Sequence, residues 1–228
     1  CHMVHTTYDE TDWDLTFADQ VTETILGIDN ADVASGEFED MGDVNMCVQC
    51  HQSLNPKGVL SATSTGDVPL SLYWGPHHGP QGNLLYGIGG GAYEIAGSMG
   101  YENSAHSGIE DGCISCHMAD AYGAQAGGHT FSMTYEYHGS EAIWTAGCAK
   151  CHSGIEDGSP DFEGKMTEIE GLLATLKTRL ETAQILNPAD GLVNVPRNGS
   201  IEITVDQAAA LYNYFFVMED RSMGIHNP

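Results

Sequence analysis

Six of the seven cysteines fall into three C-x-x-C pairs, and a histidine follows directly after each pair. The sequence also opens on Cys1-His2, which matches the second half of a fourth copy. We expect two residues and an upstream cysteine to precede this start. The three complete copies are Cys47-Val-Gln-Cys50-His51, Cys113-Ile-Ser-Cys116-His117 and Cys148-Ala-Lys-Cys151-His152.

Several kinds of site use paired cysteines, but only one also requires the histidine. Zinc sites contain C-x-x-C pairs without a fixed histidine after each, and thioredoxin-like motifs occur singly within an α/β pattern. Disulfides and iron–sulfur clusters leave the histidine unexplained. C-x-x-C-H is the sequence for covalent haem attachment, in which the thiols add to the vinyl groups and the histidine ligates the iron. We therefore expect four haem c groups, and a haem held by one thioether is the alternative at Cys1.

Eleven histidines are enough to give every iron two imidazole ligands. Methionine is the other common distal ligand, but bis-histidine ligation is the simpler account. His5 lies only three residues after His2, so we expect it to ligate a neighbouring haem or a haem of another subunit. The expected proximal ligands are His2, His51, His117 and His152, and the candidate distal ligands are His5, His77, His78, His106, His129, His138 and His226.

Four segments carry a family resemblance: Pro76-His-His-Gly-Pro-Gln81, Gly112-Cys-Ile-Ser-Cys-His-Met-Ala119, Gly127-Gly-His-Thr-Phe131 and Glu219-Asp-Arg-Ser-Met-Gly-Ile-His-Asn-Pro228. They resemble multihaem cytochromes c related to the ammonia-forming nitrite reductases. The resemblance covers roughly residues 44–228, and it implies that His77 or His78, His129 and His226 are distal ligands. The catalytic C-x-x-C-K of that family is missing, which argues against nitrite reduction. A tetrahaem chain with only histidine ligands is more similar to extracellular cytochromes that polymerise into conductive filaments, or nanowires.

The elements that must position these groups are expected to be mainly helix and loop, organised around the haems, with little β structure. Helical spacing predicts two C-terminal helices, over 165–186 and over 207–220 with Asp206 as N-cap. A short β-prone run covers 201–205, and a short helix is predicted over 14–26. Composition predicts loop over 54–70 and no regular structure over 87–91. We expect one tetrahaem domain over 1–228, with residues 164–222 as a helical segment packed on the haem core.

A second feature is a repeat: residues 106–112 and 152–158 are identical. Two interpretations stay open. Either both histidines occupy equivalent haem-ligand environments, or the segment is a recurrent acidic turn. The segment Asn198-Gly-Ser200 matches an N-glycosylation site, which is a weak signal when it occurs alone.

The charge excludes several classes of partner. Seven Lys and Arg against 32 Asp and Glu give a formal net charge of −25. Binding to nucleic acid or to an anionic membrane surface requires Lys and Arg, so neither is expected. No apolar run reaches the 18 residues of a transmembrane helix.

These observations favour electron transfer rather than catalysis, so we expect no enzyme activity. The expected partners are redox proteins or extracellular acceptors, together with further copies of the chain in a homopolymer. Because haem is attached outside the cytoplasmic membrane, the protein is expected to be exported to the cell surface or beyond, with the periplasm as the alternative. Two other functions stay open: an oxidoreductase with one open haem that reduces a nitrogen or sulfur oxyanion, and a monomeric periplasmic electron carrier.

Overall fold

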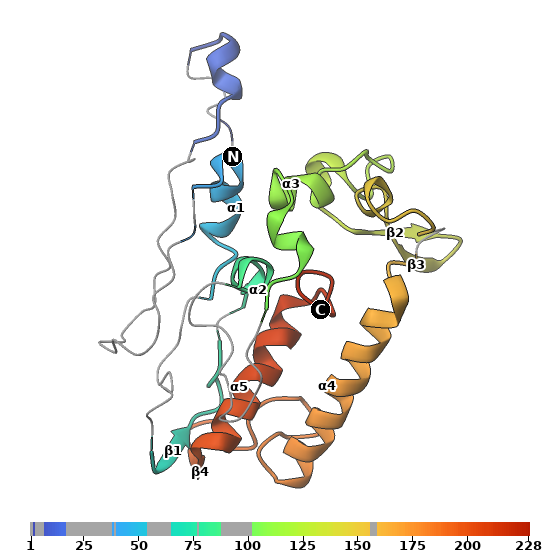
Figure 1. Cartoon of the computed structure of the whole chain (residues 1–228). Coiled ribbons are helices and arrows are strands. Elements are labelled where there is room, and N and C mark those ends of the chain that lie inside the picture. Colours follow the sequence, from blue (N-terminus) through green and yellow to red (C-terminus); the bar gives the residue numbers. More distant parts are fainter. Residues whose placement is uncertain are drawn as a thin grey trace.

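The computed structural model describes residues 2, 7–16, 38, 40–53, 65–76, 78–87, 102–155 and 159–228. Within these residues the chain is mainly helix and loop, with two sheets of two strands each (Figure 1). The expected fold class, with little β structure and two C-terminal helices, is confirmed at this level. Among the described residues, none of the helices combines the length and the apolar character that crossing a bilayer requires.

Helix α4 spans Lys165–Thr182 and begins beside the carboxylate of Asp161. The backbone N–H of Met166 and the hydroxyl of Thr167 donate to this carboxylate, at 2.8 and 2.6 Å. The prediction that the helix continues to residue 186 was wrong. Gln184 has a φ of 59°, so the chain leaves the helix there and turns back.

Helix α5 spans Val205–Asp220 and has Thr204, not Asp206, as its N-cap. The backbone N–H of Gln207 donates to Thr204 Oγ1 at 3.3 Å, and Gln207 Oε1 accepts from the backbone N–H of Thr204 at 3.1 Å. This reciprocal capping box satisfies two backbone donors at once, whereas Asp206 lies in the first turn. The helix ends at Arg221, whose φ is 64°.

Strand β1 (Asp67–Leu70) pairs antiparallel with β4 (Ile201–Thr204). The β-prone run was therefore predicted correctly, but the prediction of loop was wrong for residues 67–70. Val68 and Leu70 are buried while Asp67 and Pro69 are exposed, so buried and exposed side chains alternate along the strand. A proline is tolerated here because β1 is an edge strand. Residues 54–64 and 88–91 of the predicted loops lie outside the described residues, and Gly87 ends a helix at a φ of 60°.

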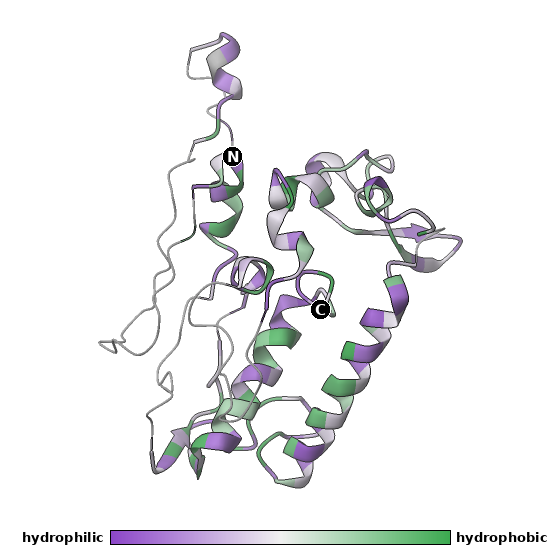
Figure 2. Ribbon diagram, viewed as in Figure 1, coloured by the Kyte–Doolittle hydropathy of each residue, from purple (hydrophilic) through white to green (hydrophobic). Residues whose placement is uncertain are grey.

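The two helices and this sheet enclose the larger apolar core, which we call the C-terminal core. The apolar faces of α4 and α5 are visible in Figure 2. Tyr212 of α5 is 1% exposed and meets the ring of Trp74 edge-on, with centroids 5.8 Å apart. The buried members are Val68, Leu70, Trp74, Leu173, Leu180, Ile185, Leu186, Val193, Ile203, Ala208, Leu211, Tyr212, Tyr214 and Phe216.

The paired cysteines lie outside the C-terminal core. The first complete pair overlaps α1 (Asn45–Val48), which follows the 3-10 helix η2 (Gly42–Val44) and packs beside α2 (Gln81–Tyr86). A smaller core of Phe38, Val44 and Val48 lies in this part of the chain.

Residues 102–155, which we call the motif region, carry the other two pairs. Its helices are short: η3 (Ala105–Gly108), α3 (Gly112–His117), η4 (Gly128–Thr130) and η5 (Cys148–Lys150). A hairpin of β2 (Thr134–Tyr137) and β3 (Ser140–Ile143), which was not predicted, completes it. Ala119 and Ala126 are the only buried hydrophobic residues of this region. Side chains of the motif region therefore do not form a core of ordinary size.

Before α1, the described residues include η1 (Glu10–Trp13) and an isolated bridge between His2 and Leu15. Of the helix predicted over 14–26, residues 14–16 are not helical and the rest lies outside the described residues. A final 3-10 helix, η6 (Phe162–Gly164), leads into α4.

Candidate functional site: paired histidines beside the cysteine motifs

Each complete motif starts as a helical turn. The backbone N–H of His51 donates to the carbonyl of Cys47 at 2.9 Å, and that of His152 donates to the carbonyl of Cys148 at 2.8 Å. In a helical turn, residues i, i+3 and i+4 share one face. Both cysteines and the histidine of a motif therefore lie on the same side of the turn, as attachment to one flat ligand requires.

The six cysteines of the complete motifs are free thiols. The described residues also contain no group of three or more His, Cys, Asp and Glu suited to a metal ion. A haem iron takes four of its ligands from the porphyrin and only two from the protein, so a search for three protein ligands does not bear on it. Cys1 lies outside the described residues.

Three of the four expected proximal histidines lie opposite another histidine. The ring centroids are 6.1 Å apart for His2 and His129, and 6.3 Å apart for His117 and His226. They are 5.8 Å apart for His106 and His152. The two histidines of the repeat thus form one of the pairs.

This separation can be compared with what one metal atom between two imidazoles requires. An imidazole nitrogen lies about 2 Å from the metal that it ligates, and the ring centre lies about 1 Å further away, so two imidazoles on opposite sides of one atom have centroids about 6 Å apart. All three separations agree with that value. The residues therefore fit an iron held between each pair.

Hydrogen bonds to Nδ1 fix most of these rings. The Nδ1 atom of His117 lies 2.9 Å from the carbonyl oxygen of Phe131, and that of His226 lies 2.6 Å from Asp220 Oδ1. Nδ1 of His106 lies 2.5 Å from the carbonyl oxygen of Ile225. With Nδ1 donating, Nε2 is left as the free lone pair, which is the tautomer of a metal-ligating histidine.

The fourth expected site is only partly described. Nδ1 of His51 lies 2.8 Å from Gln81 Oε1, but among the described residues no ring is paired with the imidazole of His51. Nδ1 of His78 lies 2.7 Å from Glu219 Oε2, and the His78 side chain is 75% exposed. His5 and His77 lie outside the described residues.

His138 is separate from these pairs. It lies at the tip of the β2–β3 hairpin with a φ of 51°, it is exposed, and its ring contacts Tyr137. A positive φ at His138 and Gly139 is typical of a tight two-residue hairpin turn. Its position is explained by the turn, and the described residues do not bring it to a cysteine motif.

The motifs also lie against one another. The thiols of Cys47 and Cys113 are hydrogen bonded, which lowers the pKa of Cys47 to about 7 and raises the pKa of Cys113. Burial raises the pKa of Cys116, and the cysteines at 148 and 151 are close enough to raise it further. Burial also lowers the pKa of His117, and neighbouring His226 and His51 act in the same direction. The second, third and fourth motifs thus form a continuous series.

A glycine sets the approach between the last two motifs. A Cβ on Gly147 would lie 2.9 Å from the Cα of Cys116 and 3.2 Å from the carbonyl oxygen of Ser115. Only glycine lets the backbone come this close. No pattern in the sequence around Gly147 indicated this role.

The end of α5 organises several of the rings. Gln81, which contacts His51, donates from Nε2 to the backbone carbonyls of Glu219 and Asp220, at 3.0 and 3.2 Å. The Glu219 carboxylate contacts His78 and the Asp220 carboxylate contacts His226. Sequence reasoning missed these partners, although Glu219 and Asp220 belong to a segment that carried the family resemblance.

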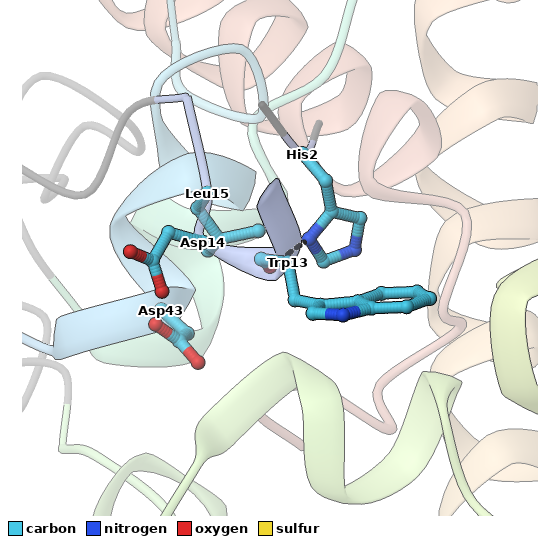
Figure 3. Close-up of a pocket in the computed structure, with 5 residues that line it drawn as sticks. All are labelled: His2, Trp13, Asp14, Leu15 and Asp43. Carbon is cyan, nitrogen blue, oxygen red and sulfur yellow. Dashed lines mark hydrogen bonds between the residues drawn. The ribbon is translucent and has the colours of Figure 1, made fainter. Parts of the chain in front are cut away.

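A cavity of about 320 Å³ lies beside His2. Its lining is His2, Trp13, Asp14, Leu15 and Asp43 (Figure 3). The carbonyl oxygen of Trp13 accepts from Nδ1 of His2, and the Trp13 side chain is exposed to 75%. This cavity belongs to the same site as the His2–His129 pair.

Comparison of the chain with known protein families, curated proteins and solved structures found no match.

Proposed function

We propose that this chain is an electron-transfer protein that carries four covalently attached c-type haems. The observation that supports it most directly is the spacing of the three histidine pairs, each of which joins a C-x-x-C-H histidine to a histidine distant in sequence. When bound, haem iron supplies reversible one-electron exchange between its ferric and ferrous states.

The residues of this chain would divide the work as follows. The paired cysteines would attach the groups, and the histidines that follow them would ligate the irons. His129, His226 and His106 would supply the second imidazoles, and hydrogen bonds to Nδ1 hold the rings of His226 and His106 in place. At the three paired sites, two imidazoles would leave no position at the iron for a substrate. We therefore favour transfer of electrons over catalysis.

The contacts between motifs support passage of electrons along the chain. Cys47 touches Cys113, and Cys116 lies beside the fourth motif. Groups attached at these thiols would be close neighbours, so electrons need no large movement of the protein between them. Imidazole ligation and a net charge of −25 both favour ferric iron. We expect midpoint potentials below the standard hydrogen reference.

The haem assignment is tested by the purified protein. A pyridine haemochrome assay should give four haems per chain. The visible spectrum should be low-spin and should not change with cyanide or nitrite. A high-spin component that binds either anion would instead support the oxidoreductase with an open iron.

We further propose that the chain assembles head to tail into an extracellular filament, with His5 ligating a haem of the adjacent subunit. His5 is too close to His2 in sequence to reach the far face of the same haem easily. A contact of this type does not close on itself and so generates a filament.

Electron microscopy tests the filament, and the chain offers a matched control. His5→Ala should abolish filaments while His138→Ala, which removes an exposed histidine at the hairpin tip, should leave them intact. Dispersed particles of the unmodified protein at high concentration would contradict the filament and support a monomeric carrier.

A further inference from the structure

The described imidazoles differ in the charge of the atom that accepts from Nδ1. For His2, His106 and His117 the acceptor is a backbone carbonyl oxygen, and it is neutral. For His226 it is the carboxylate of Asp220, at 2.6 Å. Among the three described pairs, the pair of His117 and His226 is thus the one with an anionic acceptor.

The Asp220 carboxylate is buried and well held. Its side chain is 0% exposed, and that of His226 is 17% exposed. Its Oδ2 accepts from the backbone N–H of Ser222 at 3.1 Å and from the Ser222 hydroxyl. Ser222 Oγ in turn accepts from the backbone N–H of His226 at 3.1 Å. These donors stabilise the ionised carboxylate and fix it against the ring.

A carboxylate that accepts from a ligating histidine makes its other nitrogen a stronger electron donor. A stronger donor, with a buried negative charge behind it, stabilises ferric iron relative to ferrous iron. The Glu219 carboxylate differs because its partner His78 is largely exposed, where solvent screens the charge.

We propose that Asp220 is a positioning residue that gives the haem held by His117 and His226 the lowest midpoint potential of the three paired sites. The inference rests on the proposed haem function. The reaction is the gain of one electron by ferric iron, supplied in the experiment by dithionite, and the proton stays on Nδ1 of His226. Of the three paired sites, this haem would be reduced last and oxidised first.

The test is a redox titration of the haem-loaded protein with Asp220→Asn. The amide oxygen can still accept from Nδ1, so the variant removes the charge and keeps the bond to His226, while the amide nitrogen in the place of Oδ2 no longer accepts from the backbone N–H of Ser222. We expect about a tenfold shift of one haem's equilibrium toward the ferrous state, at the lower end of the effect of losing an outer-shell partner, which is about 59 mV upward for a one-electron couple. The other haems should not shift. Electron paramagnetic resonance should show one altered low-spin ferric site.

Two further variants make the result specific. Asp206→Asn removes the same charge from the exposed start of α5 and should shift no haem. Ser222→Ala removes a hydroxyl that donates to Asp220, so the carboxylate should accept more strongly from His226. The midpoint potential of the same haem should therefore shift downward. If Asp220→Asn does not take up its haems, a downward shift in Ser222→Ala supports the role of Asp220, and an upward shift or no shift contradicts it.

Haems with unchanged potentials in both Asp220→Asn and Ser222→Ala would overturn the role of Asp220. A uniform shift of all haems in Asp220→Asn would do the same. A purified protein without covalent haem would instead overturn the proposed function, so the two failures are distinguishable.

Discussion

Gly147 lies where the third and fourth motifs touch, and Gly147→Ala should push them apart. A Cβ would lie 2.9 Å from the Cα of Cys116 and 3.3 Å from its carbonyl oxygen. Carbon atoms in favourable contact are about 3.5–4.0 Å apart, so the backbones must separate by about 0.6 Å or more. The neighbouring atoms belong to the backbone and cannot rotate away.

The magnitude follows from two opposing effects. Gly147 has φ −66° and ψ −38°, which alanine adopts without strain. Alanine therefore gains about 0.4–1 kcal/mol by restricting the unfolded chain, whereas forcing a methyl group into a packed contact costs about 1–3 kcal/mol. Gly108→Ala is the matched control, because nothing lies within 4 Å of its Cβ position. The entropy gain is common to both variants, so their stabilities should differ by the steric cost, about 1–3 kcal/mol.

Denaturant unfolding of the two haem-loaded variants measures this difference. Equal stability of Gly147→Ala and Gly108→Ala would refute the close approach of the two motifs. A Gly147→Ala variant more stable than the unmodified protein would refute it as well.

Three other predictions concern ligation, pH and folding. His106→Met should raise the potential of one haem, by roughly tens to hundreds of millivolts within the ~0.8 V that axial ligands span, as a redox titration would show, and no shift would mean that His106 is not a ligand. Hydrogen bonds from Thr167 and the start of α4 lower the pKa of the Asp161 carboxyl. The ionised carboxyl therefore stabilises the fold above its unfolded-state pKa, and this stabilisation is lost as the pH falls through the lowered pKa of the folded state. The free energy of unfolding of Asp161→Asn should thus depend less on pH between pH 6 and about 2 than that of the unmodified protein, and parallel curves would contradict this. Replacing the six cysteines of the complete motifs by alanine should leave the amides of α4 and α5 protected from hydrogen exchange, because these helices lie on the C-terminal core. The amides of the motif region should exchange rapidly. Protection of both parts would contradict a core made of haem.

Local sequence patterns were sufficient to predict the elements of the C-terminal part of the chain. Both C-terminal helices and the strand at 201–204 follow from periodicity and β propensity. The ends were less predictable because each depends on one residue: Gln184 turns the chain out of α4, and Thr204 outcompetes Asp206 as N-cap through its exchange with Gln207. Strand β1 was missed because Pro69 and its polar neighbours are typical of loops, whereas its pairing with β4 is a long-range contact.

The candidate site divides in the same way. The cysteine motifs are contiguous in sequence, so the haem prediction rests on the sequence alone, and it stays a prediction. Which histidine faces which could not be predicted, because His129 and His2, or His226 and His117, are brought together only by the folded chain. Asp220 is still harder to recognise: an aspartate at the end of an acidic helix gives no sign that its side chain is buried against an imidazole.

The C-terminal core has a consequence for how the chain could acquire the proposed haems. It joins β1 to β4 and α5, and α4 packs on α5, so the roughly 95 residues between β1 and α4, with two of the motifs, are anchored to one core through the elements that flank them. His226 follows the end of α5. A tether of this kind raises the effective concentration of one group near another to about the millimolar range. The chain itself would thus supply the second imidazole of an attached haem as an intramolecular ligand. This supply does not require that the motif region already has a packed interior.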